Sequence, residues 1–159
     1  MSQEAMQTTG SIVTAARRRW LLVCLLLATG CSSFRSDWHD AACFDCQTVG
    51  LEGRWEGTWC SHVNGHHGKL KAIITKQSEN CYCAQFRATY AKVLPFGFDT
   101  PLTVTEGDGV YHLEGEADLG WLAGGTFNCC GSANACELES GYCAPNDHGA
   151  FSLRRVCCE

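Results

Sequence analysis

The sequence has no apolar run long enough to cross a bilayer as a helix, which takes about 20 residues. Its longest apolar run, residues 20–28, is less than half that length and ends in the small residues Thr29 and Gly30. Three arginines, residues 17–19, stand directly before it. A basic block, a short apolar run and small residues have the order of a secretory signal. We therefore predict that residues 1–30 form a signal helix that directs export.

The sequence also lacks the short motifs that mark common catalytic sites. It contains no G-x-S-x-G nucleophile elbow, no phosphate-binding glycine loop and no H-E-x-x-H zinc motif. Its carboxylates lie where solvated strand and turn positions account for them. We predict no catalytic residues and no enzymatic activity; a hydrolase with an unrecognised site is the least favoured alternative.

Basic residues are scarce. Removing residues 1–30 takes three arginines and one acidic residue from totals of twelve and seventeen, which leaves nine Lys and Arg against sixteen Asp and Glu. The resulting net charge near −7 repels phosphate, so we predict no nucleic-acid partner. The 129 residues that remain of 159 suffice for one domain with a core and are too few for two.

The residues that follow the apolar run carry a family resemblance. Leu27-Ala-Thr-Gly30-Cys31 resembles the lipobox of bacterial lipoproteins. That resemblance implies cleavage before Cys31, acylation of its thiol and amine with groups such as palmitate, and anchoring in the membrane of a bacterial cell envelope, facing the periplasm or the cell surface. The alternative is an ordinary signal peptide cut near Gly30. We divide the chain into a signal peptide (1–30), a tether (31–50) and a domain (51–159).

Cysteine is abundant, with thirteen in the chain, and predicts an oxidising compartment and a disulfide-bonded domain. Eleven cysteines follow Cys31: Cys43, Cys46, Cys60, Cys81, Cys83, Cys129, Cys130, Cys136, Cys143, Cys157 and Cys158. Their odd number leaves at least one without an intramolecular partner. Cys43 and Cys46 form a C-x-x-C in the tether and not at a helix start, so we expect no redox site. A thiolate zinc site is less favoured than disulfides outside the cytoplasm.

Short alternating segments fill the rest of the chain. Tyr82, Ala84 and Phe86 alternate with more polar residues, a period of two that predicts a half-buried strand. We predict eight such strands, at residues 53–60, 69–76, 81–92, 100–106, 109–116, 121–128, 134–139 and 149–156. No segment after the signal shows helical spacing. We predict an all-β fold, a small antiparallel up-and-down barrel of about eight strands, with a β-sandwich as the alternative.

Two further resemblances bear on this domain. Gly53-Arg-Trp55 on the first predicted strand resembles the G-x-W signature of lipocalins and their calycin relatives. In those barrels the Trp closes one end beneath a basic residue of the last strand, which implies that role for Trp55 with Arg154 or Arg155. The W-x-G-x-W, G-H-x-G-x-L and D-H-G-x-F segments are similar to those of small secreted bacterial proteins to which no activity is attached.

A histidine-rich rim follows from the barrel topology. Loops after the first and seventh strands open at the same end and become neighbours when the barrel closes. They carry His62, His66, His67, Asp147 and His148, with Cys143 nearby. Imidazole and carboxylate groups suit zinc, copper or nickel, so these residues are candidate metal ligands. The other interpretation is that Asn-Gly, His-His-Gly and Asp-His-Gly are ordinary turn sequences.

The same rim has apolar loops at residues 93–98 and 119–121. They are suited to admitting an apolar ligand or to resting against a membrane. Alternatively, they fold inward and plug the barrel, and we favour the plug because side chains fill the interior of many eight-stranded barrels.

The sequence thus predicts a membrane-anchored lipoprotein of the bacterial envelope with a non-enzymatic binding or structural domain and no cofactor. Its small-molecule or protein partner is left open. The alternative is a periplasmic metal-binding protein that holds zinc or copper at the histidine-rich rim.

Overall fold

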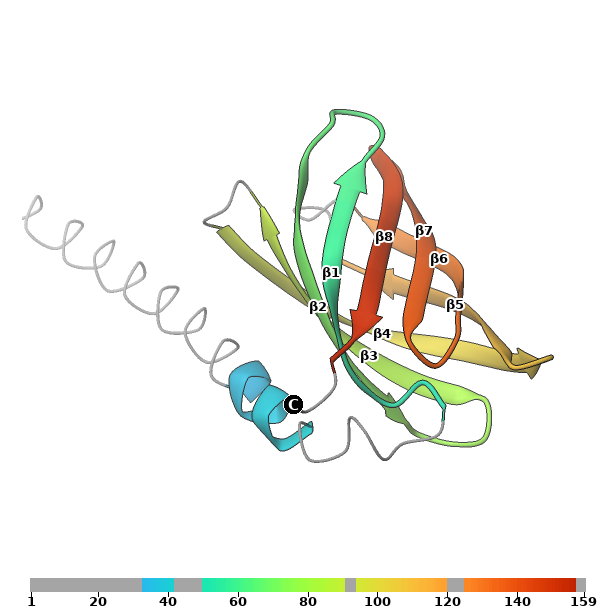
Figure 1. Ribbon diagram of the computed structural model, residues 1–159. Helices are drawn as coiled ribbons and strands as arrows, with labels where there is room; N and C mark the ends of the chain where they lie inside the picture. The colour runs from blue at the N-terminus through green and yellow to red at the C-terminus, as the bar shows by residue number, and fades with distance from the viewer. Residues whose placement is uncertain (1–32, 42–49, 91–93, 120–124, 157–159) are drawn as a thin grey trace, which may run out of the picture. The chain divides into compact units, whose positions relative to one another are not determined.

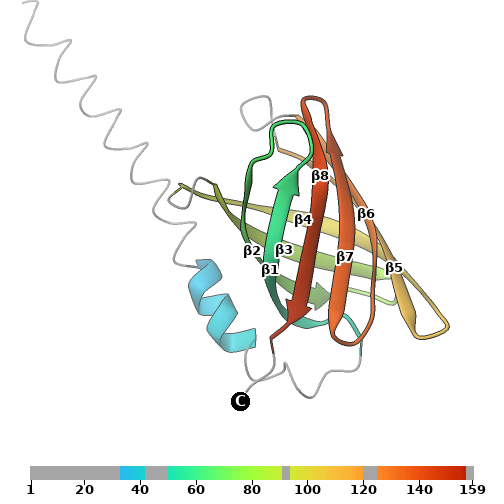
Figure 2. The same ribbon diagram turned by 45° about the horizontal axis from the view of Figure 1, so that its top comes forward.

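The structure, a computed structural model, describes residues 33–41, 50–90, 94–119 and 125–156. Within this part, eight antiparallel strands form a closed barrel in which each strand pairs with the next and the last strand pairs with the first (Figures 1 and 2). The predicted all-β up-and-down barrel is confirmed, and the sandwich alternative is excluded. The predicted signal peptide and Cys31, Cys43, Cys46, Cys157 and Cys158 lie outside the described residues.

The strands follow the predicted order with shifted bounds. They are β1 Gly53–Ser61, β2 His67–Lys76, β3 Cys81–Tyr90, β4 Leu94–Gly107, β5 Val110–Asp118, β6 Thr126–Ala133, β7 Glu137–Ala144 and β8 Asp147–Arg155. β4 begins six residues earlier than predicted, because it pairs with β3 from Leu94 onward despite its prolines. The ladder to β5 reaches only as far as Leu102, beside Pro101, which has no N–H to donate.

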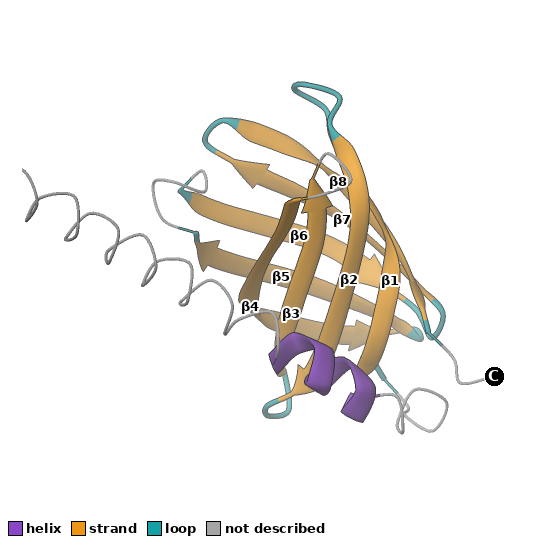
Figure 3. Ribbon diagram, turned by 90° about the vertical axis from the view of Figure 1, so that its left-hand side faces the viewer, coloured by secondary structure: helices purple, strands orange, loops and turns teal. Residues whose placement is uncertain are grey.

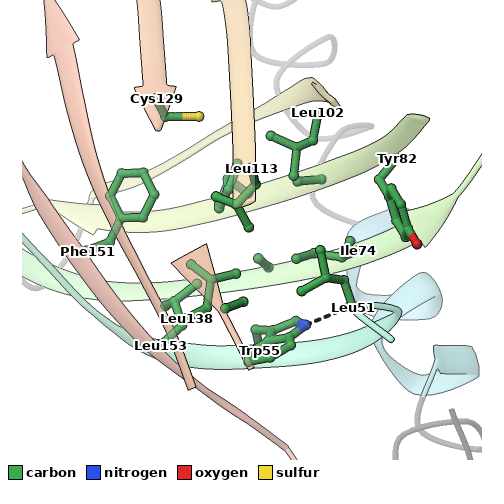
Figure 4. Close-up of a cluster of buried hydrophobic side chains, with 14 of the residues drawn as sticks. Leu51, Trp55, Ile74, Tyr82, Leu102, Leu113, Cys129, Leu138, Phe151 and Leu153 are labelled. Atoms are coloured by element: carbon green, nitrogen blue, oxygen red, sulfur yellow. Dashed lines mark hydrogen bonds between the residues drawn. The ribbon is translucent and has the colours of Figure 1, made fainter. Parts of the chain in front are cut away.

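The strand alternation buries one face of each strand inside the barrel. At one end, apolar side chains from several strands pack together without reaching solvent, among them Leu51, Trp55, Ile74, Leu138 and Leu153 (Figure 4). Burying a side chain of this size stabilises the fold by about 1.5–3 kcal/mol. This end of the barrel is a packed core.

Trp55 and Arg155 seal the packed end. Trp55 is fully buried, and its indole Nε1 donates a hydrogen bond of 2.9 Å to the carbonyl oxygen of Leu51 (Figure 4). The Arg155 guanidinium carbon lies 4.5 Å from the centre of the Trp55 ring, and its nitrogens donate to the carbonyl oxygens of Gly50 and Glu52. Arg155 thus takes the position that the calycin resemblance assigns to a basic residue.

Arg154 lies on the outer face of β8. Its Nη2 is 3.1 Å from Glu137 Oε1, and its side chain is 81% exposed. The alternation of the strand explains why only one of these two neighbouring arginines reaches Trp55.

The described cysteines do not form the predicted disulfides. Seven lie in this part of the chain, and all are free thiols: Cys60, Cys81, Cys83, Cys129, Cys130, Cys136 and Cys143. The strand register explains this, because it places no two of the strand cysteines directly opposite each other. Cys81 faces Thr103, and Cys130 faces Glu114 and Gly141.

A short helix occupies residues 33–40, within the segment predicted as a tether (Figure 3). Phe34, Trp38 and Ala41 are partly buried and follow one another at helical spacings of four and three residues. The prediction that no segment after the signal is helical is wrong here, because this pattern extends over only about two turns. In the described residues, no helix is long and apolar enough to cross a membrane.

We predict that Arg155→Met lowers the free energy of unfolding by about 2–3 kcal/mol, because it removes hydrogen bonds to partly buried carbonyls and the contact with the Trp55 ring. Arg154→Met is the matched control; loss of its exposed ion pair should cost at most about 0.5 kcal/mol. Urea unfolding followed by tryptophan fluorescence measures both. Equal effects of the two substitutions would show that Arg155 does not seal the barrel.

Candidate functional site

The opposite end of the barrel is hollow. Described side chains line an open cavity of about 510 Å³, within the usual range for small-molecule sites. Its rim includes Tyr90 and Phe96, which are both exposed to solvent. The favoured prediction of a plugged barrel is wrong for the described part of the rim. Val93 and Trp121, which belong to the same apolar loops, lie outside the described residues.

An aromatic wall surrounds most of the cavity. Its rings come from alternate positions of β3, β4, β6, β7 and β8, which all point inward: Phe86, Phe98, Phe127, Tyr142 and Phe151. Neighbouring ring centres lie between 5.1 and 6.4 Å apart, as in Phe98–Phe127 and Phe127–Phe151. These separations are typical of attractive aromatic pairs, so contacts among the rings stabilise the wall without a ligand.

Two strand glycines make room for cavity aromatics. Tyr142 is paired with Gly149, and a Cβ added to Gly149 would come within 2.7 Å of the Tyr142 ring and 1.9 Å of the Cys60 carbonyl oxygen. In the same way, Gly68 is paired with Trp59, whose Nε1 would lie 2.8 Å from an added Cβ. The missing side chains let both rings lie flat along the barrel wall.

A polar cluster around Asp147 interrupts the apolar lining, and the exposed Asn146 lines the cavity beside it. Asp147 is the first residue of β8, points inward and lines the cavity. Its Oδ1 accepts a hydrogen bond of 2.5 Å from the Ser61 hydroxyl, and its Oδ2 accepts one of 3.1 Å from the Tyr142 hydroxyl. Burial raises the pKa of Tyr142, and the hydrogen bond and charge of Asp147 raise it further. Tyr142 therefore stays a neutral donor.

A second aromatic group lies at the mouth. The Trp59 and Tyr90 rings are stacked with centres 6.3 Å apart, and both line the cavity. Trp59 Nε1 donates to the Thr89 carbonyl oxygen at 3.4 Å, and the Tyr90 hydroxyl is 2.8 Å from His66 Nδ1. These contacts hold the two rings at the entrance.

The structure places the two histidine loops side by side. The His62 N–H donates to the His148 carbonyl oxygen at 2.8 Å, and the rings of these two residues meet edge to face with centres 6.0 Å apart. The remaining candidate ligands have other partners: His66 contacts Tyr90, and His67 Nδ1 lies 3.2 Å from the Gly65 carbonyl oxygen.

Asp147 turns into the barrel and so away from these histidines. In the described ranges, no three His, Cys, Asp or Glu side chains are placed to hold one metal ion. Cys143 lies on the outer face of β7, opposite His148.

The predicted apolar loops supply part of the cavity lining, namely Pro95, Phe96, Phe98 and Leu119, whereas other residues of the site were missed. Trp59, Ser61 and Tyr142 were not singled out, although all three fall on the inward positions of their strands. The available signal was the alternation itself, which identifies inward positions once the strand bounds are known.

Comparisons with known proteins identify no family for this chain. No protein-family model and no curated protein matches the sequence. A solved structure that does match is the crystal structure of Echinococcus granulosus fatty-acid-binding protein 1, with 12% sequence identity. The match covers 67% of this chain and 98% of that chain, with a TM-score of 0.34.

We predict that Gly149→Ala lowers the free energy of unfolding by about 2 kcal/mol, because the added methyl group must displace Tyr142 or the β1 backbone. Gly107→Ala is the matched control, since nothing lies within 4 Å of its added Cβ; its effect should stay within about 0.5 kcal/mol. Thermal and urea unfolding measure both. If the two variants were equally stable, the close packing of Tyr142 on Gly149 would be refuted.

Proposed function

We propose that this protein is a non-enzymatic binding protein that holds a largely apolar small molecule inside its barrel. The observation that carries this proposal is the cavity of about 510 Å³ with an aromatic wall and one polar cluster near its mouth. A concave, mostly apolar site with a few fixed polar groups is the usual form of a small-molecule site.

The two ends of the barrel support this role. The end around Trp55 is packed and sealed, so a ligand enters from the opposite end, where Tyr90 and Phe96 are exposed. Transfer of apolar surface from water into such a cavity contributes about 25 cal/mol per Å². The Asp147 cluster orients a ligand that also carries a polar group, because the remaining described wall is almost entirely apolar.

We further propose that the chain is exported and anchored to the membrane of the cell envelope through a lipid on Cys31. The order of the three arginines, the apolar run and the lipobox-like residues 27–31 supports this part of the proposal. An anchored barrel of this kind would bind its ligand outside the cytoplasm.

The cavity is tested with N-phenyl-1-naphthylamine, a neutral apolar probe whose fluorescence rises on leaving water. We expect saturable binding to the wild-type protein and at least about tenfold weaker binding to Ala88→Phe, because the new ring fills the cavity. Thr105→Phe adds the same ring at an exposed position of β4 and should bind as the wild type does. Unaltered binding by Ala88→Phe would place the site elsewhere, and no binding by the wild type would contradict the proposed function.

The anchor is tested by expressing the full chain in a bacterial host and separating membrane from soluble fractions. We expect Cys31→Ser to move the protein out of the membrane fraction, because it removes the thiol that would be acylated. Cys24→Ser is the matched control and should leave the protein with the membranes. A Cys31→Ser variant that stays in the membrane fraction would refute anchoring through this residue.

A further inference from the structure

We infer that the cavity selects amphiphiles with a cationic amine head group over those with a carboxylate, with uncharged alcohols between them. This inference rests on the proposed function and adds the chemical class of the ligand. It follows from the charge, hydrogen bonding and aromatic surroundings of the one polar cluster that faces the cavity.

The described wall carries a negative charge and no balancing cation. Asp147 lines the cavity, and none of its described lining residues is Lys or Arg. A ligand carboxylate brought next to Asp147 would place two like charges in a poorly hydrated site, which disfavours binding. An ammonium group at the same place pairs with the carboxylate. The charge of the lining therefore distinguishes the two head groups.

Asp147 has acceptor capacity left for a ligand. A carboxylate offers about four lone-pair positions, and Ser61 and Tyr142 each supply one hydrogen bond. Ser61 is itself held, because its Oγ accepts from the backbone N–H groups of Val63 and Asn64 at 3.2 and 3.3 Å. Asp147 is thus fixed in position before a ligand arrives. An ammonium or hydroxyl group can donate to its free lone pairs, whereas a carboxylate cannot.

The aromatic rings at the mouth also favour a cationic head group over an anionic one. Trp59 and Tyr90 line the cavity as a stacked pair, and the Tyr142 ring borders the Asp147 carboxylate. The faces of such rings attract cations and do not attract anions. The negative net charge of the chain, −5 at pH 7, also opposes the approach of anions.

The test uses three ligands with the same chain length, namely dodecylamine, dodecanol and dodecanoate. Each displaces N-phenyl-1-naphthylamine at pH 7, below the concentration at which it forms micelles. We expect the wild type to bind the amine at least about tenfold more tightly than dodecanoate, with the alcohol between them. Asp147→Asn should weaken amine binding about tenfold and leave alcohol binding within about threefold.

Glu139→Gln is the matched control. Glu139 Oε1 also accepts a hydrogen bond of 2.5 Å from a serine hydroxyl, that of Ser152, but Glu139 is exposed on the outside of the barrel. Its substitution should leave the order of the three ligands unchanged. The same loss of amine binding in both variants would show that overall charge, and not Asp147, determines selectivity, and would overturn the inference.

The outcomes separate this inference from the proposed function. If neither the probe nor any ligand binds, the proposed function fails. If all three ligands displace the probe equally, or dodecanoate binds most tightly, the proposed function stands and the inference is overturned. If Asp147→Asn fails to fold, the inference is tested by the order in which the wild type binds the three ligands and by the salt dependence of that binding. Raising salt should weaken amine binding more than alcohol binding, because salt screens the attraction between the ammonium group and the negative charge of the protein.

Discussion

The ladder between β1 and β8 closes the barrel and determines both of its ends. Its register pairs Trp55 with Arg155 at one end and Ser61 with Gly149 at the other. The first pair seals the packed core, and the second brings Ser61 beside Asp147, two residues before Gly149. Side chains in a strand alternate with a period of two. A shift of the β1–β8 register by one residue would therefore turn the inward side chains at both ends out of the barrel. The core and the candidate site therefore depend on the same set of hydrogen bonds.

The same alternation produces a packed end and a hollow end because the inward residues differ in size along each strand. Around Trp55, buried apolar side chains from several strands pack together. Toward the mouth, Gly68 and Gly149 carry no side chain, and Trp59 and Tyr142 lie over them against the wall. Each ring occupies the space that the paired glycine leaves free, so the two rings pack closely against the wall.

The polar groups near the mouth divide into two sets with different surroundings. Asp147 and Tyr142 point into the barrel, where burial and the carboxylate raise the pKa of the tyrosine. The histidines of the adjoining loops contact one another, Tyr90 or the loop backbone. Asp147 and His148 are neighbours in sequence, yet they belong to different sets, because β8 begins at Asp147 and successive strand residues face opposite sides.

The sequence by itself determined the class of fold, the number and order of the strands and the common rim of the alternate loops. These features follow from hydrophobic period and turn residues, which are local. Only the tertiary structure decided that Arg155 and not Arg154 lies over Trp55, that β4 starts at Leu94, and that a cavity remains. Each of these depends on which side chains meet across strands, and that depends on the register of a closed sheet, which no local pattern specifies.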